Sequence, residues 1–278
     1  MNRLVSIELQ KIWKNKASKV LTLTYFILLS FIALIASIKF DIGIFKFHLA
    51  EMGIFNFPFI WHFNTYIAAW LKFFLAIVIV SMMANEYSYG TLKQNLIDGL
   101  SKKEFVLSKF LTVVVFAFCS TIFVFAMSLI LGLCFSSYTE FGIIFTDLDY
   151  LLAFFVKLTG FFSFCLFLGV LVKRSAFALG FLLVWSILEG IVKGLLVFKV
   201  FPKSNTGYMI IQFLPLEAMS NLILLPFLRL SMIKNIQNQI GYENNIDYSV
   251  NYFSILIVLI WTFLFVYFSY KILKNRDL

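Results

Sequence analysis

The sequence contains few charged residues, few cysteines and only two histidines. Charged side chains make up 13% of the 278 residues, and hydrophobic side chains make up 62%. A soluble domain of ordinary composition carries about 25% charged residues, so this composition excludes a soluble globular protein and indicates an integral membrane protein. The net charge of +9 comes largely from residues that flank the hydrophobic runs, and we therefore expect no binding of nucleic acid.

The scarcity of cysteine and histidine limits the possible chemistry. The three cysteines, Cys119, Cys134 and Cys165, all lie inside hydrophobic runs, and no C-x-x-C motif occurs. We expect no metal site and interpret the cysteines as small core residues. The motifs G-x-x-x-x-G-K-[ST], H-E-x-x-H and G-x-S-x-G are also absent. We therefore expect no catalytic residue and no cofactor bound by this chain.

Long hydrophobic runs account for most of the chain. A helix needs about 20 apolar residues to cross a bilayer, and five runs meet this length: 20–38, 66–84, 110–135, 150–172 and 252–270. A sixth run, 176–198, is interrupted by Glu189 and Lys193. The sequence predicts an all-α polytopic membrane protein with six transmembrane helices, forming one domain over residues 1–278.

The basic residues outside the spans are distributed unevenly. If the N-terminus is inside, the inner segments carry fourteen Lys and Arg residues and the outer segments carry six. Because basic residues favour the cytoplasmic side, we predict a multi-pass protein of the bacterial cytoplasmic (inner) membrane with both termini in the cytoplasm.

The N-terminal region 1–19 precedes the first span. Within 3–16, the apolar side chains lie on one helical face, and they are Val5, Leu9, Ile12 and Trp13. This pattern predicts an interfacial elbow helix, which membrane lipid holds through the apolar stripe and through attraction of lysines to anionic headgroups. A merely solvated basic tail is the alternative.

The segment between the last two spans, 199–251, is long and is predicted to lie outside. Its uninterrupted apolar piece, 216–225, has about ten residues, which is too short to cross a bilayer and suits a re-entrant or surface helix. All four prolines lie in outer segments, where the backbone need not form an unbroken helix.

Residues 85–109 form a polar, basic region between two spans. Ser101 and Glu104 have the spacing of a capping box, so a helix is predicted to begin at about Lys102 and to continue into the next span. Upstream, apolar residues recur every three or four positions as far as Leu100, and Gly99 suits a helix C-terminus. The region therefore predicts a short amphipathic helix, a glycine break and a capped helix, which together can present a surface to a soluble partner.

Four ionisable residues fall within the predicted spans: Lys72, Lys157, Glu189 and Lys193. One interpretation is snorkelling to the outer headgroups, together with an i,i+4 ion pair between Glu189 and Lys193. The other is a substrate pathway through an outer vestibule with a net positive lining, suited to an anionic headgroup or product. We interpret His48 and His62 as parts of an aromatic belt at the outer interface.

Two segments and the overall arrangement together resemble a known family. The first segment is the basic elbow Glu8-Leu9-Gln10-Lys11-Ile12-Trp13-Lys14. The second is Glu86-Tyr87-Ser88-Tyr89-Gly90-Thr91-Leu92, followed by Ser101-Lys102-Lys103 and by Lys109. With six spans and a short re-entrant piece at 213–221, the chain resembles the permease subunits of type-2 ABC exporters. The family more often has an arginine where this chain has Lys102 and Lys103.

The resemblance implies a membrane-spanning subunit that is not itself an enzyme. A separate soluble ATP-binding subunit would hold ATP and Mg, and a second permease copy or a paralogue would complete a pathway for an amphipathic or lipid-linked substrate. The helix near 90–98 would be the coupling helix, with Tyr89, Leu92 and Leu96 docking, Lys93, Lys102 and Lys103 meeting acidic groups, and Glu86 anchoring the loop. The full set of coupling residues is Glu86, Tyr89, Gly90, Thr91, Leu92, Lys93, Leu96, Ser101, Lys102, Lys103 and Glu104.

Other function classes remain open from the sequence. An ion-gradient-driven secondary carrier would transport substrate without an ATPase. A membrane scaffold or immunity-type binding protein would not transport at all, and an intramembrane enzyme would act on its substrate within the bilayer.

Overall fold

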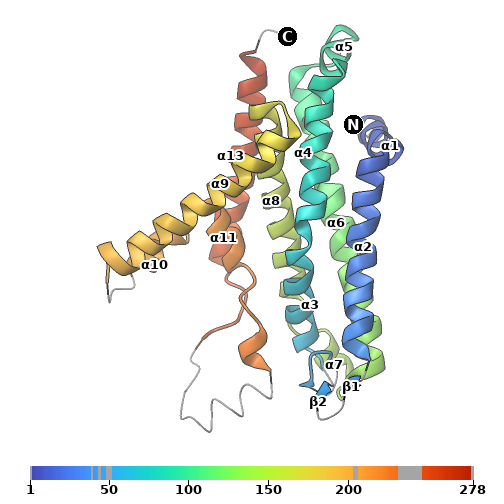
Figure 1. Cartoon of the computed structure of the whole chain (residues 1–278), viewed down its shortest axis with the longest axis vertical. Coiled ribbons are helices and arrows are strands. Elements are labelled where there is room, and N and C mark those ends of the chain that lie inside the picture. The colour runs from blue at the N-terminus through green and yellow to red at the C-terminus, as the bar shows by residue number, and fades with distance from the viewer. Residues whose placement is uncertain are drawn as a thin grey trace.

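Long helices run side by side along the longest axis of the molecule (Figure 1). The computed structural model describes residues 2–38, 40–42, 45–47, 52–202, 206–230 and 246–276. Within this part, five helices are long and apolar enough to cross a membrane, and a bent pair brings the total to six. The predicted all-α polytopic fold is confirmed. The regular non-helical structure described is one antiparallel hairpin of β1 (Phe40–Ile42) and β2 (Phe45–Phe47), in which Phe40 lies opposite Phe47.

Helix α8 (Asp149–Val172) lies at the centre of the bundle. It packs against α6 (Lys102–Phe135), α13 (Tyr252–Lys274) and the helices of the second span. Most of its span is buried, so an almost continuous run of apolar residues suits its surroundings. Helix α2 (Lys16–Ser37) lies at the edge, where it leaves most of its apolar surface to the bilayer.

The second span is bent, although the sequence predicts one helix over 66–84. It consists of α3 (Phe59–Trp70) and α4 (Lys72–Ser88), whose axes differ by 46°. At Leu71 the backbone forms tighter bonds, because the Leu71 N–H donates to the Ala68 carbonyl at 3.2 Å and the Phe74 N–H donates to the Leu71 carbonyl at 3.1 Å. This turn of i→i+3 bonds replaces the α-helical pattern and redirects the chain.

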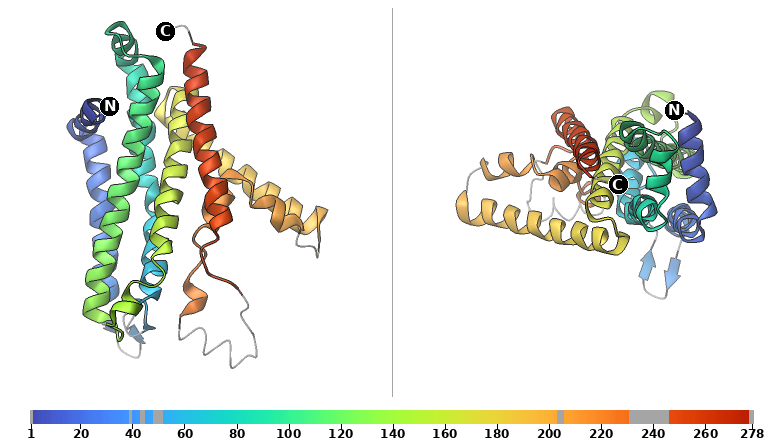
Figure 2. Two further views of the ribbon diagram at one scale, coloured as in Figure 1. Left: turned by 180° about the vertical axis from the view of Figure 1, so that it is seen from behind. Right: turned by 90° about the horizontal axis from the view of Figure 1, so that it is seen from above.

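The fifth span points away from the other helices (Figures 1 and 2). It is formed by α9 (Ser175–Gly194) and a π-helical turn η2 (Leu195–Val200), close to the predicted 176–198, and few of its side chains are buried. Helix α10 (Thr206–Ile211) packs against η2. Helix α11 (Pro215–Asn221) then returns to pack against α8, α9 and α13.

Helix α11 occupies only part of the predicted re-entrant piece 216–225. It begins with Pro215 at its first turn, where proline is well tolerated, and ends at Asn221. A short 3₁₀ helix η3 (Phe227–Arg229) follows. Residues 203–205 and 231–245 of the predicted outer segment lie outside the described residues.

The two ends of the bundle carry different elements. Helix α1 (Asn2–Lys14), the short helix α5 (Thr91–Ile97) and the C-terminal end of α13 lie at one end, and the hairpin and α7 (Phe141–Ile144) lie at the other (Figure 1). A helix thus occurs in the predicted region 3–16, and it ends at Lys14. It is separated from α2 at Asn15, whose side chain accepts a hydrogen bond from the Ser18 N–H at 3.1 Å and so caps α2.

Candidate functional site: the α5 end of the bundle

The connection from α4 through α5 to α6 is built as the sequence predicts. Gly90 and Gly99 have positive φ angles of 67° and 96°, a conformation that glycine adopts without steric cost. Ser101 Oγ accepts from the Glu104 N–H at 3.2 Å, and Glu104 Oε2 accepts from the Ser101 N–H at 3.1 Å, which confirms the capping box. Helix α6 then runs unbroken for 34 residues, or about 50 Å. It exceeds the roughly 30 Å of the hydrocarbon core, so part of α6 is free to extend beyond the apolar layer.

A buried ionic cluster connects α5 to the neighbouring helices. We call it the Glu86 cluster, and it consists of Glu8, Lys11, Glu86, Thr91 and Lys109. Glu86 Oε1 accepts from Lys109 Nζ at 2.6 Å and from Lys11 Nζ at 2.9 Å, and Glu86 Oε2 accepts from Thr91 Oγ1 at 2.6 Å. Glu8 bonds to the same two ammonium groups, at 2.5 Å to Lys109 and 3.3 Å to Lys11. Two carboxylates and two ammonium groups therefore balance one another.

The cluster is shielded from solvent. Lys109 is 1% exposed and Glu86 is 3% exposed, while the Lys11 side chain is partly open. Burial by itself lowers the pKa of Lys11, but the hydrogen bond to Glu86 and the charge of Glu8 outweigh it, so the pKa lies above 10.5. Breaking such a pair on one side strands a charge in a site of low polarity, which costs much more than the loss of an exposed pair.

The Glu86 cluster joins four elements, because its members come from α1, α4, α5 and α6. The sequence predicts Glu86 as the anchor of the loop, and the structure places it inside α4, from where it reaches α5 through Thr91. The sequence does not identify Glu8, Lys11 and Lys109 as its partners. Each charge lies beside apolar residues in its helix, which signals a buried partner, but the pairing of Lys109 with Glu8 spans 101 positions.

The predicted docking residues divide into exposed and buried ones. Tyr89 is 73% exposed, and Lys93 and Lys103 are also exposed. Leu92, a predicted docking residue, is only 2% exposed and belongs to the hydrophobic core of the chain, and Leu96 is partly buried against it. The apolar face of α5 packs against the hydrophobic core of its own helix bundle, which removes these side chains from water.

Ile97 is an exposed apolar residue of α5, in contrast to the predicted docking residue Leu92. It is 70% exposed and lies four residues after Lys93 in α5, a spacing that places two side chains on the same side of a helix. Tyr89 is exposed at the end of α4, two residues before α5 begins. An isolated apolar residue on the polar side of α5 is the signal that could identify it. We call Tyr89, Lys93 and Ile97 the α5 surface.

Lys102 contacts its own chain. Its Nζ donates to the carbonyl oxygens of Lys274 at 3.2 Å and Arg276 at 2.9 Å, at the end of α13. Unpaired carbonyls at a helix C-terminus attract cations. The contact therefore links α6 to α13, and the role of Lys102 toward an acidic group of a partner stays a prediction.

The ionisable residues of the spans gather mainly around α11. Glu189 Oε2 accepts from the N–H groups of Leu216 at 3.0 Å and Glu217 at 3.1 Å, which are free donors at the start of α11. Lys157 Nζ lies 3.4 Å from the Ser220 carbonyl near its end. A carboxylate at the N-terminus and an ammonium group at the C-terminus both complement the helix dipole.

The predicted i,i+4 pair of Glu189 and Lys193 is wrong. In the described part of the chain Lys193 pairs with Glu217 at 2.6 Å, because the amide groups of α11 occupy the Glu189 carboxylate. Lys72 lies at the bend of the second span, 4.4 Å from the centre of the Phe161 ring, where a cation–π contact stabilises it.

Other sequence interpretations concern isolated residues. His62 is buried, and its ring lies between the Leu224 carbonyl at 2.8 Å and Arg229 Nη1 at 3.0 Å. His48 lies outside the described residues.

Of the three cysteines only Cys165 is buried, and the interpretation of Cys119 and Cys134 as core residues is wrong, because both face outward from α6. No group of three His, Cys, Asp or Glu side chains that could hold a metal ion occurs in the described ranges.

The family model described as "Protein of unknown function (DUF2705)" matches residues 26–278. No curated protein matches the sequence.

Proposed function

We propose that this chain, which belongs to the DUF2705 family, is the membrane-spanning subunit of an ATP-driven exporter. In this proposal the α5 surface rests on a separate soluble subunit that binds ATP and Mg. Two such chains, or this chain and a paralogue, enclose the path of an amphipathic or lipid-linked substrate. Both termini and α5 lie on the cytoplasmic side of the bacterial inner membrane.

The observation that carries the proposal is the Glu86 cluster. A push on α5 can move the spans only if α5 is held firmly by them. Thr91 fixes the first turn of α5 to Glu86 in α4, and Lys109 fixes the same carboxylate to α6 and to α1. A displacement of α5 is therefore shared by three helices at once, which is how a small shift at a contact becomes a rigid-body movement.

The α5 surface has the composition of a small protein contact. Tyr89 and Ile97 offer apolar area, and Lys93 lies between them in sequence with an exposed ammonium group. Aromatic and apolar anchors beside one charge are typical of contacts that dominate an interface. A partner with an apolar groove and an acidic residue at its edge would fit it.

The first test is co-purification of the tagged chain from its native membrane in mild detergent. We expect a soluble ATP-binding subunit to be recovered in equimolar amount with the wild type. Ile97→Asp should lose that subunit, because it places a charge in an apolar contact while leaving the core of the permease untouched. Tyr138→Asp, at an exposed position beyond the opposite end of α6, is the matched control and should retain the subunit.

Three results would contradict the proposal in part or in whole. Retention of the subunit by Ile97→Asp would remove the α5 surface from the contact. Recovery of the permease alone, together with ion-gradient-driven transport by the purified chain in liposomes, would identify a secondary carrier. Recovery of the permease alone without transport would identify a scaffold or immunity-type binding protein.

A further inference from the structure

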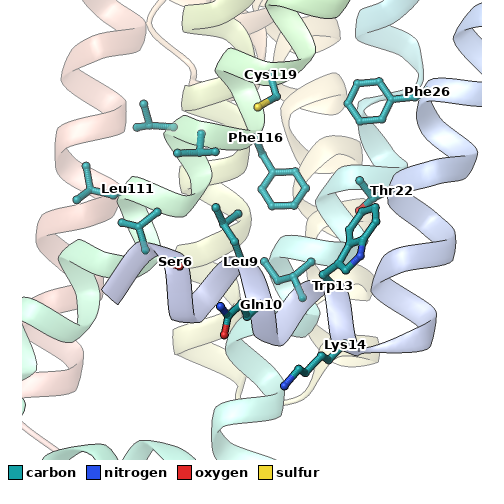
Figure 3. A pocket seen from close by; sticks show the side chains of 14 residues that line it. Ser6, Leu9, Gln10, Trp13, Lys14, Thr22, Phe26, Leu111, Phe116 and Cys119 are labelled. Carbon is teal, nitrogen blue, oxygen red and sulfur yellow. The ribbon is translucent and has the colours of Figure 1, made fainter. Parts of the chain in front are cut away.

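An apolar groove of about 830 Å³ lies between α1, α2 and α6 (Figure 3). Its walls come from α2 and from one side of α6, and α1 crosses one end of it. The side chains that line it are mostly aliphatic or aromatic and include Leu9, Trp13, Phe26, Leu111, Phe116 and Cys119. The Thr22 hydroxyl in the wall donates to the Ser18 carbonyl at 2.8 Å, so this polar group is already satisfied within its own helix.

The groove has the depth of one leaflet. From Leu111 to Cys119 its wall follows α6 for eight residues, which corresponds to about 12 Å of helix. The hydrocarbon core is about 30 Å thick, so one leaflet accounts for roughly 15 Å. Because α6 runs along the long axis of the bundle (Figure 1), the groove runs in the direction of lipid acyl chains and ends at α1, where headgroups begin.

The rim of the groove is polar and carries one sign of charge. Gln10 and Lys14 point from α1 away from Phe116 and Cys119, as Figure 3 shows. Lys14 is a cation, and the residues lining the groove include no acidic side chain. Lys19 adds a second ammonium group, 5.1 Å from the centre of the Trp13 ring. An anionic group at this rim is favoured by both lysines.

We propose that this groove is a binding site for one phospholipid with an anionic headgroup, whose acyl chain lies along α6 and whose phosphate lies at Lys14. An acyl chain matches the apolar wall and the depth of the groove, and the phosphate matches the charge of the rim. The inference depends on insertion in a membrane and not on an ATP-binding partner, so it goes beyond the proposed function.

The lipid site affects the elbow helix α1, because two faces of α1 make contacts. Glu8 and Lys11 hold one face to the Glu86 cluster, and Leu9 and Trp13 cover the groove with the other. A lipid in the groove supports α1 from the membrane side. The bound lipid therefore helps to fix α1, which is connected to α5 through Lys109 and the rest of the Glu86 cluster.

The test uses phosphatidylglycerol with a diazirine in its acyl chain, incorporated into phosphatidylcholine vesicles that contain the full-length protein. After illumination, mass spectrometry maps the cross-linked residues. We expect cross-links to concentrate on Thr22, Phe26 and Cys119, with about tenfold more labelling than at lipid-facing positions of α6 outside the groove. Val115→Trp fills the groove and should reduce this labelling about tenfold, and Ile130→Trp, at an exposed position farther along α6, is the matched control.

A second variant separates the headgroup from the chain. Lys14→Gln leaves the groove open, so labelling by a phosphatidylcholine with the same diazirine should persist while the preference for phosphatidylglycerol falls severalfold. Even labelling of all lipid-facing helices, unchanged by Val115→Trp, would mean that only bulk lipid contacts the groove and would overturn the site. Exclusion of the probe from the groove of the wild type would assign it to a protein segment and would also overturn it.

Discussion

At the scale of single residues, we expect substitution of Lys109 to cause the largest loss of stability. Its ammonium group is buried between the carboxylates of Glu8 and Glu86. Lys109→Met keeps most of the apolar stem but leaves two buried carboxylates with only Lys11 to balance them. We expect a loss of roughly 3–5 kcal/mol in the free energy of unfolding, measured by denaturant unfolding of the purified protein in detergent micelles.

Lys11 provides the matched control, because its side chain bonds to the same carboxylates but is partly open to solvent. Lys11→Met should cost less than Lys109→Met, because water can reach the place that the partly open Lys11 side chain leaves and can solvate the carboxylates there. Adding Glu86→Gln to Lys109→Met should recover part of the loss, since it removes one of the stranded charges. Equal effects of the two lysine variants would contradict a buried cluster centred on Lys109.

The sequence allows part of this residue-level description to be predicted. The capping box of Ser101 and Glu104 follows from a local motif, since its two residues lie three positions apart, whereas Glu86 and Thr91 are singled out only by the resemblance to a known family. The burial of Leu92 and the bonding of Lys109 to Glu8 depend on how distant helices pack, so a periodic pattern in one helix cannot reveal them. The apolar stripe of α5 indicates that one face is buried, but it does not tell whether a partner or the chain itself covers that face.

At the scale of elements, α11 is held at both ends by side chains from two spans. Glu189 accepts hydrogen bonds from the N–H groups of Leu216 and Glu217. Glu189→Gln keeps the shape but replaces the carboxylate with a neutral amide, which weakens the bonds to these donors. We expect amide hydrogen exchange at the start of α11 to accelerate by about tenfold, a change that corresponds to about 1.4 kcal/mol of local stability.

Lys193→Gln is the control for this element, since it removes the partly exposed ion pair with Glu217 and leaves the Glu189 bonds in place. Its effect on the same amides should be small. A uniform acceleration across α9 and α11 in the Glu189 variant would instead indicate general destabilisation. The comparison distinguishes a cap on α11 from a residue that merely keeps α9 folded.

Spans and their breaks differ in how far the sequence predicts them. Four of the five uninterrupted runs form single long helices, as their apolar length predicts, and the interrupted run 176–198 also forms a long helix. The start of α6 follows from its cap. The bend at Leu71 was not foreseen, because the residues around it, with no proline or glycine among them, read as an ordinary helix. The hydrogen bonds of Glu189 could not be predicted for a related reason. A glutamate four residues before a lysine suggests an ion pair within the helix, and only the structure shows that the amide groups of α11 lie beside the Glu189 carboxylate.

At the scale of the whole molecule, the uneven distribution of basic residues and the length of α6 lead to one prediction about orientation. Lys103 lies at one end of α6, and Tyr138 lies just beyond the other. Because α6 is long enough to cross the hydrocarbon core with several turns to spare, these two positions must face opposite compartments. The excess of Lys and Arg near the first position predicts that it lies in the cytoplasm.

Cysteine labelling tests this orientation in whole cells, in a variant that lacks Cys119 and Cys134, the two exposed thiols. Tyr138→Cys should react with a membrane-impermeant maleimide in intact cells, and Lys103→Cys should react only after the membrane is permeabilised. Both positions are exposed, so a difference in reactivity reports the compartment and not burial. The reverse pattern would place the α5 surface outside the cell, where no ATP-driven subunit could act on it.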